Sequence, residues 1–420
     1  MRARLGSLFF PTRSTVLGRT RPHGLPTARP ESVDVSPERL ARIRTVLQRE
    51  VDTERMPGAV VMIARRGRLI YSAAIGFRDK AAGEPMTKDG IFRIYSMTKP
   101  LASIGAIMLV EEGKIQLNDP VSKFLPELAK MEVMVKGTDG KTTRECAKRQ
   151  ITIHDLFRHT AGLTYGEFSY VPEIRAAYAQ AKLFTEPSRS ITPEQFTAGI
   201  AKAPLVREPG TEFEYSLAVD VLGRTIEMVS GQRLSTFLYE RLFRPLNMTD
   251  TGFKVPEKNW RRIAEPLRRQ KKFLDVTIDP VNELAGVGAV STAADYLRFC
   301  QMMLNGGTFE GNRYVSPATI RLMTSDHLGS RPAVPAPPGN TLMGVDGYTF
   351  GLGFMVRQGP GLAGVPGSEG EYMWAGHGGT FFWIDPQEEL AVVFMAQIAG
   401  GHRTYCFRMI KTLVAQALGK

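Results

Sequence analysis

The segment Ile94-Tyr-Ser-Met-Thr-Lys-Pro100 decides how this sequence is interpreted. The residues from Ile91 leading into it have the apolar character of a strand. From Ser96 to about Glu112 the apolar positions recur at helical spacing, and Gly113 is typical of a residue that ends a helix. The segment therefore predicts a strand-to-helix junction with a serine at the junction.

Ser96 and Lys99 form a Ser-x-x-Lys pattern at this junction. Residues three apart on a helix share a face, so the lysine amine can reach the serine hydroxyl. A serine in the first turn also lies at the positive end of the helix, where its own amide can face a developing oxyanion. The pattern is short, and on its own it leaves open an ordinary helix with a solvent-facing serine and lysine.

The elements predicted on either side follow a simple order. Ser36-Pro37-Glu38 predicts the start of a helix, and two strands, a mainly helical middle, further strands and a closing helix follow it. This order predicts an α/β lobe formed by both ends of the chain, with an all-α lobe inserted. The expected boundaries are residues 31–95 and 286–420 for the α/β lobe and 96–285 for the helical lobe, with the active site at their interface. The Pro- and Gly-rich residues 329–346 predict a long loop.

The charge distribution argues against a nucleic-acid or membrane partner. The net charge of +12 comes from 54 basic and 42 acidic residues, and six arginines with no acidic residue lie in residues 1–30. We expect residues 1–30 to be a disordered basic tail. The basic residues between Arg261 and Lys272 have little aromatic interleaving and predict a solvated surface. No apolar run is long enough to span a bilayer.

Several common sites are absent from the sequence. Three widely spaced cysteines form no CxxC pair, and the histidines form no HExxH pattern, so no metal site is predicted. No GxSxG, P-loop or GxGxxG pattern occurs, and no cofactor is expected. The odd cysteine number fits a reducing compartment, which predicts a cytoplasmic protein.

Further segments give the serine and lysine a context. Together with 94–100, they resemble, in the family's order, the serine β-lactamase and penicillin-binding protein superfamily. The resemblance is to its class C-like branch, and most of all to the family VIII carboxylesterases. It implies an α+β, β-lactamase-like fold, in which an antiparallel sheet flanked by helices carries the inserted helical lobe. The segments are Ile153-His-Asp-Leu-Phe-Arg-His-Thr-Ala-Gly-Leu163, Pro209-Gly-Thr-Glu-Phe-Glu-Tyr-Ser-Leu217, Pro245-Leu-Asn-Met-Thr-Asp-Thr251, Gly288-Ala-Val-Ser-Thr-Ala-Ala-Asp295 and 374–386.

The resemblance also implies roles for individual residues. Ser96 matches the acylated nucleophile and Lys99 its partner base. Tyr215 matches the tyrosine of the second motif, YxN, which helps to move the proton. The third motif, KTG in lactamases, aligns with Trp374-Ala375-Gly376, and the oxyanion amides then belong to Ser96 and His377. An alternative register places His377-Gly378-Gly379 on the third motif.

Two positions depart from the lactamase pattern. Leu217 replaces the asparagine of YxN, and Trp374 replaces the lysine of KTG. In lactamases these residues bind the amide and the carboxylate of the substrate. Their loss predicts a more apolar site, lined by Leu217 and Trp374, that favours neutral esters. His154, His159, Asp220 and Asp295 are expected to be structural.

We therefore predict a serine hydrolase that cleaves short-chain carboxylic esters through an acyl-enzyme. Weak β-lactamase, amide hydrolase and acyltransferase activities remain open within the same fold, and a non-catalytic scaffold remains open outside enzymes. The expected partner is a small-molecule ester, and a homo-oligomer is left open.

Overall fold

An eight-stranded antiparallel sheet is the centre of the computed structural model, which describes residues 24–137, 142–268, 273–329 and 337–419. The strand order is β10-β11-β12-β13-β14-β1-β2-β3, so strands from the two ends of the chain meet where β14 pairs with β1. The strands are β1 (Gly58–Arg65), β2 (Arg68–Asp79), β3 (Glu84–Pro85), β10 (Tyr348–Phe350), β11 (Met355–Arg357), β12 (Tyr372–Ala375), β13 (Phe381–Asp385) and β14 (Leu390–Ala396).

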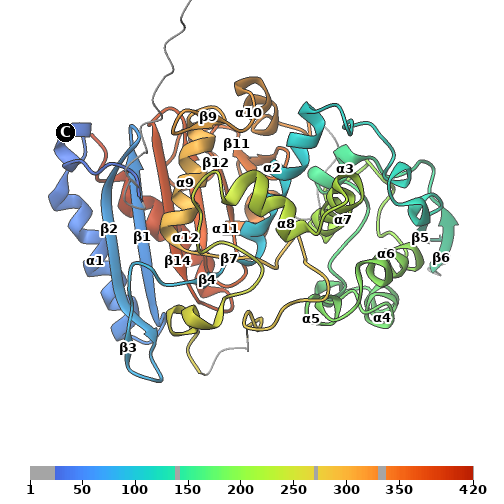
Figure 1. Ribbon diagram of the computed structural model, residues 1–420, viewed down its shortest axis with the longest axis horizontal. Helices are drawn as coiled ribbons and strands as arrows, with labels where there is room; N and C mark the ends of the chain where they lie inside the picture. Colours follow the sequence, from blue (N-terminus) through green and yellow to red (C-terminus); the bar gives the residue numbers. More distant parts are fainter. Residues whose placement is uncertain (1–23, 138–141, 269–272, 330–336, 420) are drawn as a thin grey trace, which may run out of the picture.

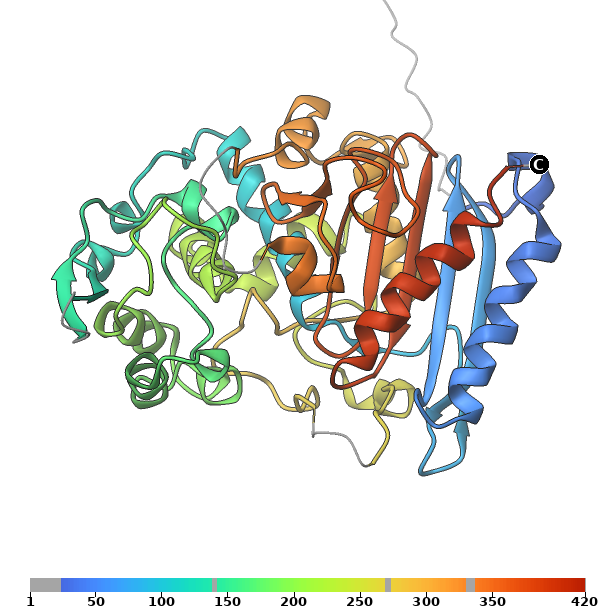
Figure 2. The same ribbon diagram turned by 180° about the vertical axis from the view of Figure 1, so that it is seen from behind.

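Helices cover both faces of this sheet. Helices α1 (Pro37–Asp52) and α12 (His402–Ala415) lie side by side on one face, seen in front of the sheet in Figure 2. Helix α9 (Ala293–Leu304) packs on the other face against β14 and β1. Every residue of β1 is buried, as expected for a central strand with helices on both sides. The predicted antiparallel sheet flanked by helices is confirmed.

The middle of the chain is largely helical and lies away from α1 and α12 (Figure 1). Its helices are α2 (Thr98–Glu111), α3 (Ile153–Phe157), α4 (Pro172–Gln180), α5 (Thr185–Arg189), α6 (Pro193–Lys202), α7 (Ala218–Ser230) and α8 (Leu234–Leu238). It also contains a hairpin of β5 (Glu132–Lys136) and β6 (Thr142–Cys146), which the sequence did not predict. The exposed β6 has little apolar signal because all five of its residues face solvent.

The remaining elements are short. They are β4 (Phe92–Arg93) paired with β7 (Val290–Ser291), the hairpin β8 (Thr308–Phe309) and β9 (Asn312–Arg313), and helices α10 (Pro317–Met323) and α11 (Pro338–Met343). Helix α11 lies inside residues 329–346, which were predicted to be a loop throughout. Its first proline begins the helix, and a left-handed Gly344 ends it.

Two predicted features lie partly outside the described residues: positions 1–23 of the basic tail, and positions 269–272 of the second basic segment. Of the rest of the tail, Leu25 is buried and Thr27 forms a bridge with Leu69 of β2. Across the described parts of the chain, no helix is both long enough and apolar enough to cross a membrane.

Candidate active site

Ser96 lies in a 3-10 turn, Tyr95–Met97, that leads directly into α2, and only 9% of the residue is exposed. Tyr95 has a φ of 43°, a left-handed conformation that is uncommon for a residue with a large side chain. The tyrosine is held in place because its hydroxyl accepts a hydrogen bond from the Leu274 amide at 3.1 Å and its ring packs edge-on against Phe273. Such constrained turns are found at functional sites, where they orient a reacting side chain.

Lys99 is only 1% exposed, and its amine is surrounded by three acceptors. The amine nitrogen is 3.3 Å from Ser96 Oγ, 2.9 Å from Tyr165 Oη and 2.8 Å from the Gly286 carbonyl oxygen. A neutral amine that donates to Tyr165 and Gly286 keeps its lone pair for the Ser96 hydroxyl proton. The structure thus brings together the serine and the lysine that the Ser-x-x-Lys spacing placed on one helical face.

Tyr165 is a site residue that the sequence did not indicate. It follows α3 in the chain, and it reaches Lys99 across 66 positions, by the hydrogen bond to its hydroxyl and by its ring, whose centroid is 5.3 Å from the amine nitrogen. Burial, together with Tyr215 and the Asp220 charge, raises its pKa well above the usual value, so its phenol stays neutral. The resembling segment ends at Leu163, and no spacing rule connects Tyr165 to the lysine.

Tyr215 lies over the lysine from the side of α7. Its ring centroid is 4.8 Å from Lys99 Nζ, within cation–π range. Its hydroxyl oxygen is buried and has no hydrogen-bond partner within the described ranges. A buried hydroxyl of a residue that packs on Lys99, with no other group bound to it, is available to a reacting molecule.

Trp374 supports Tyr215 from behind. The indole is 1% exposed, and its ring lies 5.2 Å from that of Tyr215 and 5.3 Å from that of Phe350. Trp374 lies within strand β12. Leu217, at the start of α7, is likewise buried, at 2% exposure. Both side chains make the surroundings of the site apolar, but neither forms an open wall.

The end of β12 brings Gly376 and His377 beside the serine. A side chain at Gly376 would place its Cβ 2.3 Å from the Ile94 carbonyl, so only glycine allows this approach. The Gly376 amide donates to the Thr380 carbonyl at 2.7 Å. The His377 imidazole is exposed and packs against Tyr95 and Phe168, with centroids 5.8 and 6.1 Å away. The role of the Ser96 and His377 amides as oxyanion donors remains a prediction.

Two other histidines lie in the helical part. His159 is fully buried under Tyr215, with ring centroids 4.8 Å apart, and its Nδ1 accepts from the Ser216 amide at 3.3 Å. Burial, and secondarily the Lys99 charge, lowers the His159 pKa well below its usual value, so the ring is neutral. His154 contacts His327, with a nitrogen-to-nitrogen distance of 2.9 Å. His159 therefore orients the residues around Tyr215.

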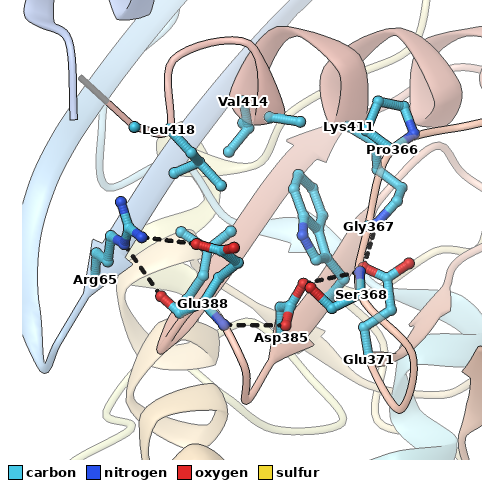
Figure 3. Close-up of a pocket in the computed structure, with 14 residues that line it drawn as sticks. Arg65, Pro366, Gly367, Ser368, Glu371, Asp385, Glu388, Lys411, Val414 and Leu418 are labelled. Atoms are coloured by element: carbon cyan, nitrogen blue, oxygen red, sulfur yellow. Dashed lines mark hydrogen bonds and ion pairs between the residues drawn. The ribbon is translucent and has the colours of Figure 1, made fainter. Parts of the chain in front are cut away.

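A separate cavity of about 540 Å³ lies beside α12 and β13 and contains none of the predicted site residues. Its charged groups are paired: Lys411 with Glu371 at 2.7 Å and Arg65 with Glu388 at 2.6 Å. Figure 3 shows Arg65 beside Glu388, and Asp385 accepting a hydrogen bond from the Ser368 amide. The Lys411–Glu371 pair ties the closing helix to the residue before β12.

Comparison with known proteins agrees with this fold. The protein-family model described as Beta-lactamase matches residues 43–415, so the chain belongs to the Beta-lactamase family. The predicted superfamily is thereby confirmed. Among its relatives, Protein Rv1367c of Mycobacterium tuberculosis is 37% identical over 364 residues, which cover 83% of this chain and 88% of that protein.

Two further relatives have descriptive names. Esterase EstB of Burkholderia gladioli is 29% identical over 380 residues, covering 86% of this chain and 90% of that protein. The solved structure of "EstCE1, a hydrolase with promiscuous acyltransferase activity" superposes with a TM-score of 0.73 at 29% identity. That superposition covers 90% of this chain and 98% of EstCE1.

Proposed function

We propose that this chain is a serine hydrolase that cleaves short-chain carboxylic esters through an acyl-enzyme on Ser96. The observation that carries the proposal is the buried Lys99 amine, 3.3 Å from Ser96 Oγ and held by Tyr165 and Gly286. A serine hydroxyl becomes a competent nucleophile when an adjacent base takes its proton. The names of EstB and EstCE1, an esterase and a hydrolase, support this reaction class.

The first half-reaction follows from these positions. Lys99 takes the Ser96 proton as Oγ bonds to the ester carbonyl carbon, and the Ser96 and His377 amides stabilise the oxyanion. Collapse of the tetrahedral intermediate breaks the bond to the leaving oxygen, which takes a proton from Tyr215. The Lys99 ammonium then returns its proton to Tyr215. In the second half-reaction, water repeats the sequence on the acyl-enzyme and releases the carboxylic acid.

Substrate preference follows from the side chains that surround the site. Leu217 and Trp374 occupy the positions where lactamases have an amide and a cation. Both side chains are apolar and buried. A carboxylate brought here would lose its hydration without gaining a partner at these positions. The loop beside His377 adds Phe168 and Tyr170, whose exposed fractions are 60% and 101%. The surroundings of the site favour neutral, apolar esters over anionic β-lactams.

Acyl transfer is the second candidate function. An alcohol in place of water in the second half-reaction gives a new ester without any other change in the chemistry. The description of EstCE1 as having promiscuous acyltransferase activity favours including it. Product analysis of p-nitrophenyl butyrate turnover in 1 M ethanol separates the two outcomes, because transfer yields ethyl butyrate.

The test of the proposal is Ser96→Ala beside Ser103→Ala. Ser103 lies on α2, the helix that follows the turn of Ser96, is fully buried and has no hydrogen-bond partner in the described part of the chain, so it is a matched control. We expect Ser96→Ala to lose at least about a thousandfold in kcat on p-nitrophenyl butyrate, while Ser103→Ala keeps its activity. A butyryl adduct of 70 Da on wild type, absent from Ser96→Ala, should appear in mass spectra of quenched enzyme. Near wild-type turnover by Ser96→Ala would refute the mechanism.

A further inference from the structure

Asp220 is a buried carboxylate next to the lysine that the mechanism above does not use. It lies in the first turn of α7, three residues after Leu217, and is 5% exposed. Its Oδ1 accepts a hydrogen bond from the Gly286 amide at 2.7 Å. The Gly286 carbonyl in turn accepts from Lys99 Nζ at 2.8 Å. One glycine thus connects the carboxylate to the amine.

The contact between Asp220 and Gly286 is unusually close. A Cβ added to Gly286 would lie 2.5 Å from Asp220 Oδ2, and its three nearest atoms would all belong to this carboxylate. No other residue can occupy position 286 without moving one of the two partners. The amide and carbonyl of Gly286 flank the same Cα, so the hydrogen bond from the amide to Asp220 restricts where the carbonyl that holds Lys99 can lie.

The carboxylate is also a charge partner of the lysine. The other titratable groups that interact with Asp220 or Lys99 come from different parts of the fold: His159, Tyr165, Glu167 and Tyr215. His159 and Tyr165 are neutral for the reasons given above. Glu167 is farther along the loop and already accepts two hydrogen bonds from Thr185.

We propose that Asp220 is a positioning residue for the esterase reaction: through Gly286 it holds the Lys99 amine toward Ser96, and its negative charge is the counter-charge of the Lys99 ammonium. The position of Asp220 is close in sequence to Leu217, where this chain lacks the asparagine of the lactamase YxN motif. The asparagine of YxN is lost at residue 217, and the carboxylate three residues later lies on the same side of α7. The inference rests on the proposed function, because it needs Lys99 to exchange a proton with Ser96.

The charge of Asp220 depends on pH within the working range of an enzyme. Burial raises the Asp220 pKa to about 6, even though Lys99 and the Gly286 amide act in the opposite direction. The carboxylate is therefore ionised at pH 7 and above. Removing this negative charge takes away a charge that favours a cation beside it, so the rising limb of the pH–rate profile is expected at lower pH.

The test compares Asp220→Asn with Asp295→Asn. Asp295 is a matched control: it is buried in the first turn of α9, its pKa is also raised to about 6 by burial, and it accepts from the Asp250 amide and Thr251 hydroxyl. Asparagine keeps the oxygen that accepts from Gly286 and removes only the charge. We expect the rising limb of kcat/KM against pH to move to lower pH by at least about 0.5 in Asp220→Asn and to stay in place in Asp295→Asn.

A double variant tests the positioning itself. Gly286→Ala should lower kcat with little change in KM, because the added methyl collides with Asp220. Asp220→Ala opens that space, so the double variant should lose no more kcat than Asp220→Ala alone. Fully additive losses would overturn the proposed contact.

The outcomes separate this inference from the proposed function. An unchanged pH profile in Asp220→Asn, with Ser96→Ala inactive, overturns the Asp220 proposal alone. An active Ser96→Ala overturns the proposed function instead. If Asp220→Asn folds poorly, as shown by its thermal unfolding, the double variant still decides the question.

Discussion

Replacing Tyr165 with phenylalanine removes one oxygen atom from the surroundings of Lys99 and leaves the aromatic ring. Tyr165 Oη is 2.9 Å from Lys99 Nζ, and both residues are buried. When Lys99 holds the Ser96 proton, its ammonium has three hydrogens and three acceptors: Ser96, Tyr165 and the Gly286 carbonyl. Without the phenol, one N–H of a buried ammonium has no acceptor.

The size of the effect follows from this geometry. A hydrogen bond to a charged group contributes about 1.5 to 3 kcal/mol, and a buried donor without a partner costs a similar amount. Because the ammonium forms as the serine attacks, most of this loss falls on the transition state. It corresponds to a decrease of about 10- to 150-fold in kcat, with little change in KM.

The control for this prediction is Tyr178→Phe. Tyr178 is fully buried in the same helical region, and its hydroxyl accepts a hydrogen bond from the Thr164 amide at 3.3 Å, away from the lysine. Both variants lose one buried hydroxyl, so a general loss of stability affects both. The kcat values of the two variants are compared in steady-state kinetics on p-nitrophenyl butyrate. The temperature of the assay is well below the unfolding temperature of each variant. Equal kcat in Tyr165→Phe and Tyr178→Phe would refute the role given to Tyr165.

Two further predictions concern pH and the neighbouring residues. Burial raises the Asp155 pKa, but hydrogen bonds from Arg149, Thr152 and Thr160 outweigh it and lower the pKa to about 2 from 3.8. The carboxylate therefore stabilises the fold above about pH 4, and this contribution of about 2.5 kcal/mol is lost as pH falls from 4 toward 2. Asp155→Asn should lower the free energy of unfolding by about 2.5 kcal/mol at pH 7 and by less at pH 3. Urea unfolding at the two pH values measures this difference. Equal losses of unfolding free energy at pH 7 and pH 3 would contradict the prediction. His377→Ala removes an exposed imidazole but keeps the backbone amide, so kcat should change less than about fivefold. The substitution should also leave the shape of the rate profile near pH 6.5 unchanged. A limb near 6.5 that disappears in His377→Ala would instead make His377 the base.

The parts of the site that could be predicted are those fixed by local periodicity. Ser96 and Lys99 are three residues apart, across the 3-10 turn and the start of α2, and that spacing brings the amine toward the hydroxyl. The strands expected before and after the helical middle, which include β1, β13 and β14, were predicted for a similar reason, since buried strands consist of continuous apolar residues. In both cases the information lies within a few adjacent residues.

The parts that could not be predicted depend on contacts between distant segments. Tyr165 and Gly286 reach Lys99 across 66 and 187 positions, and neither has a sequence signal of its own. The burial of Trp374 could not be predicted either, because Tyr215 and Phe350, which pack against it, come from two other segments. The resemblance implied that the indole is part of the site, while only the packing shows that it contacts Tyr215.

The contacts from distant segments also explain how Lys99 is surrounded. Lys99 is buried with neutral acceptors on three sides, and the carboxylate of Asp220 is linked to it through a single glycine. A direct ion pair would hold the amine permanently as an ammonium and deprive Ser96 of its base. A carboxylate that acts through the Gly286 backbone steadies the ammonium when it forms without binding it directly. The Tyr215 hydroxyl has no partner in the described part of the chain, and in the proposed mechanism it is the group that passes a proton to the leaving oxygen of a neutral ester.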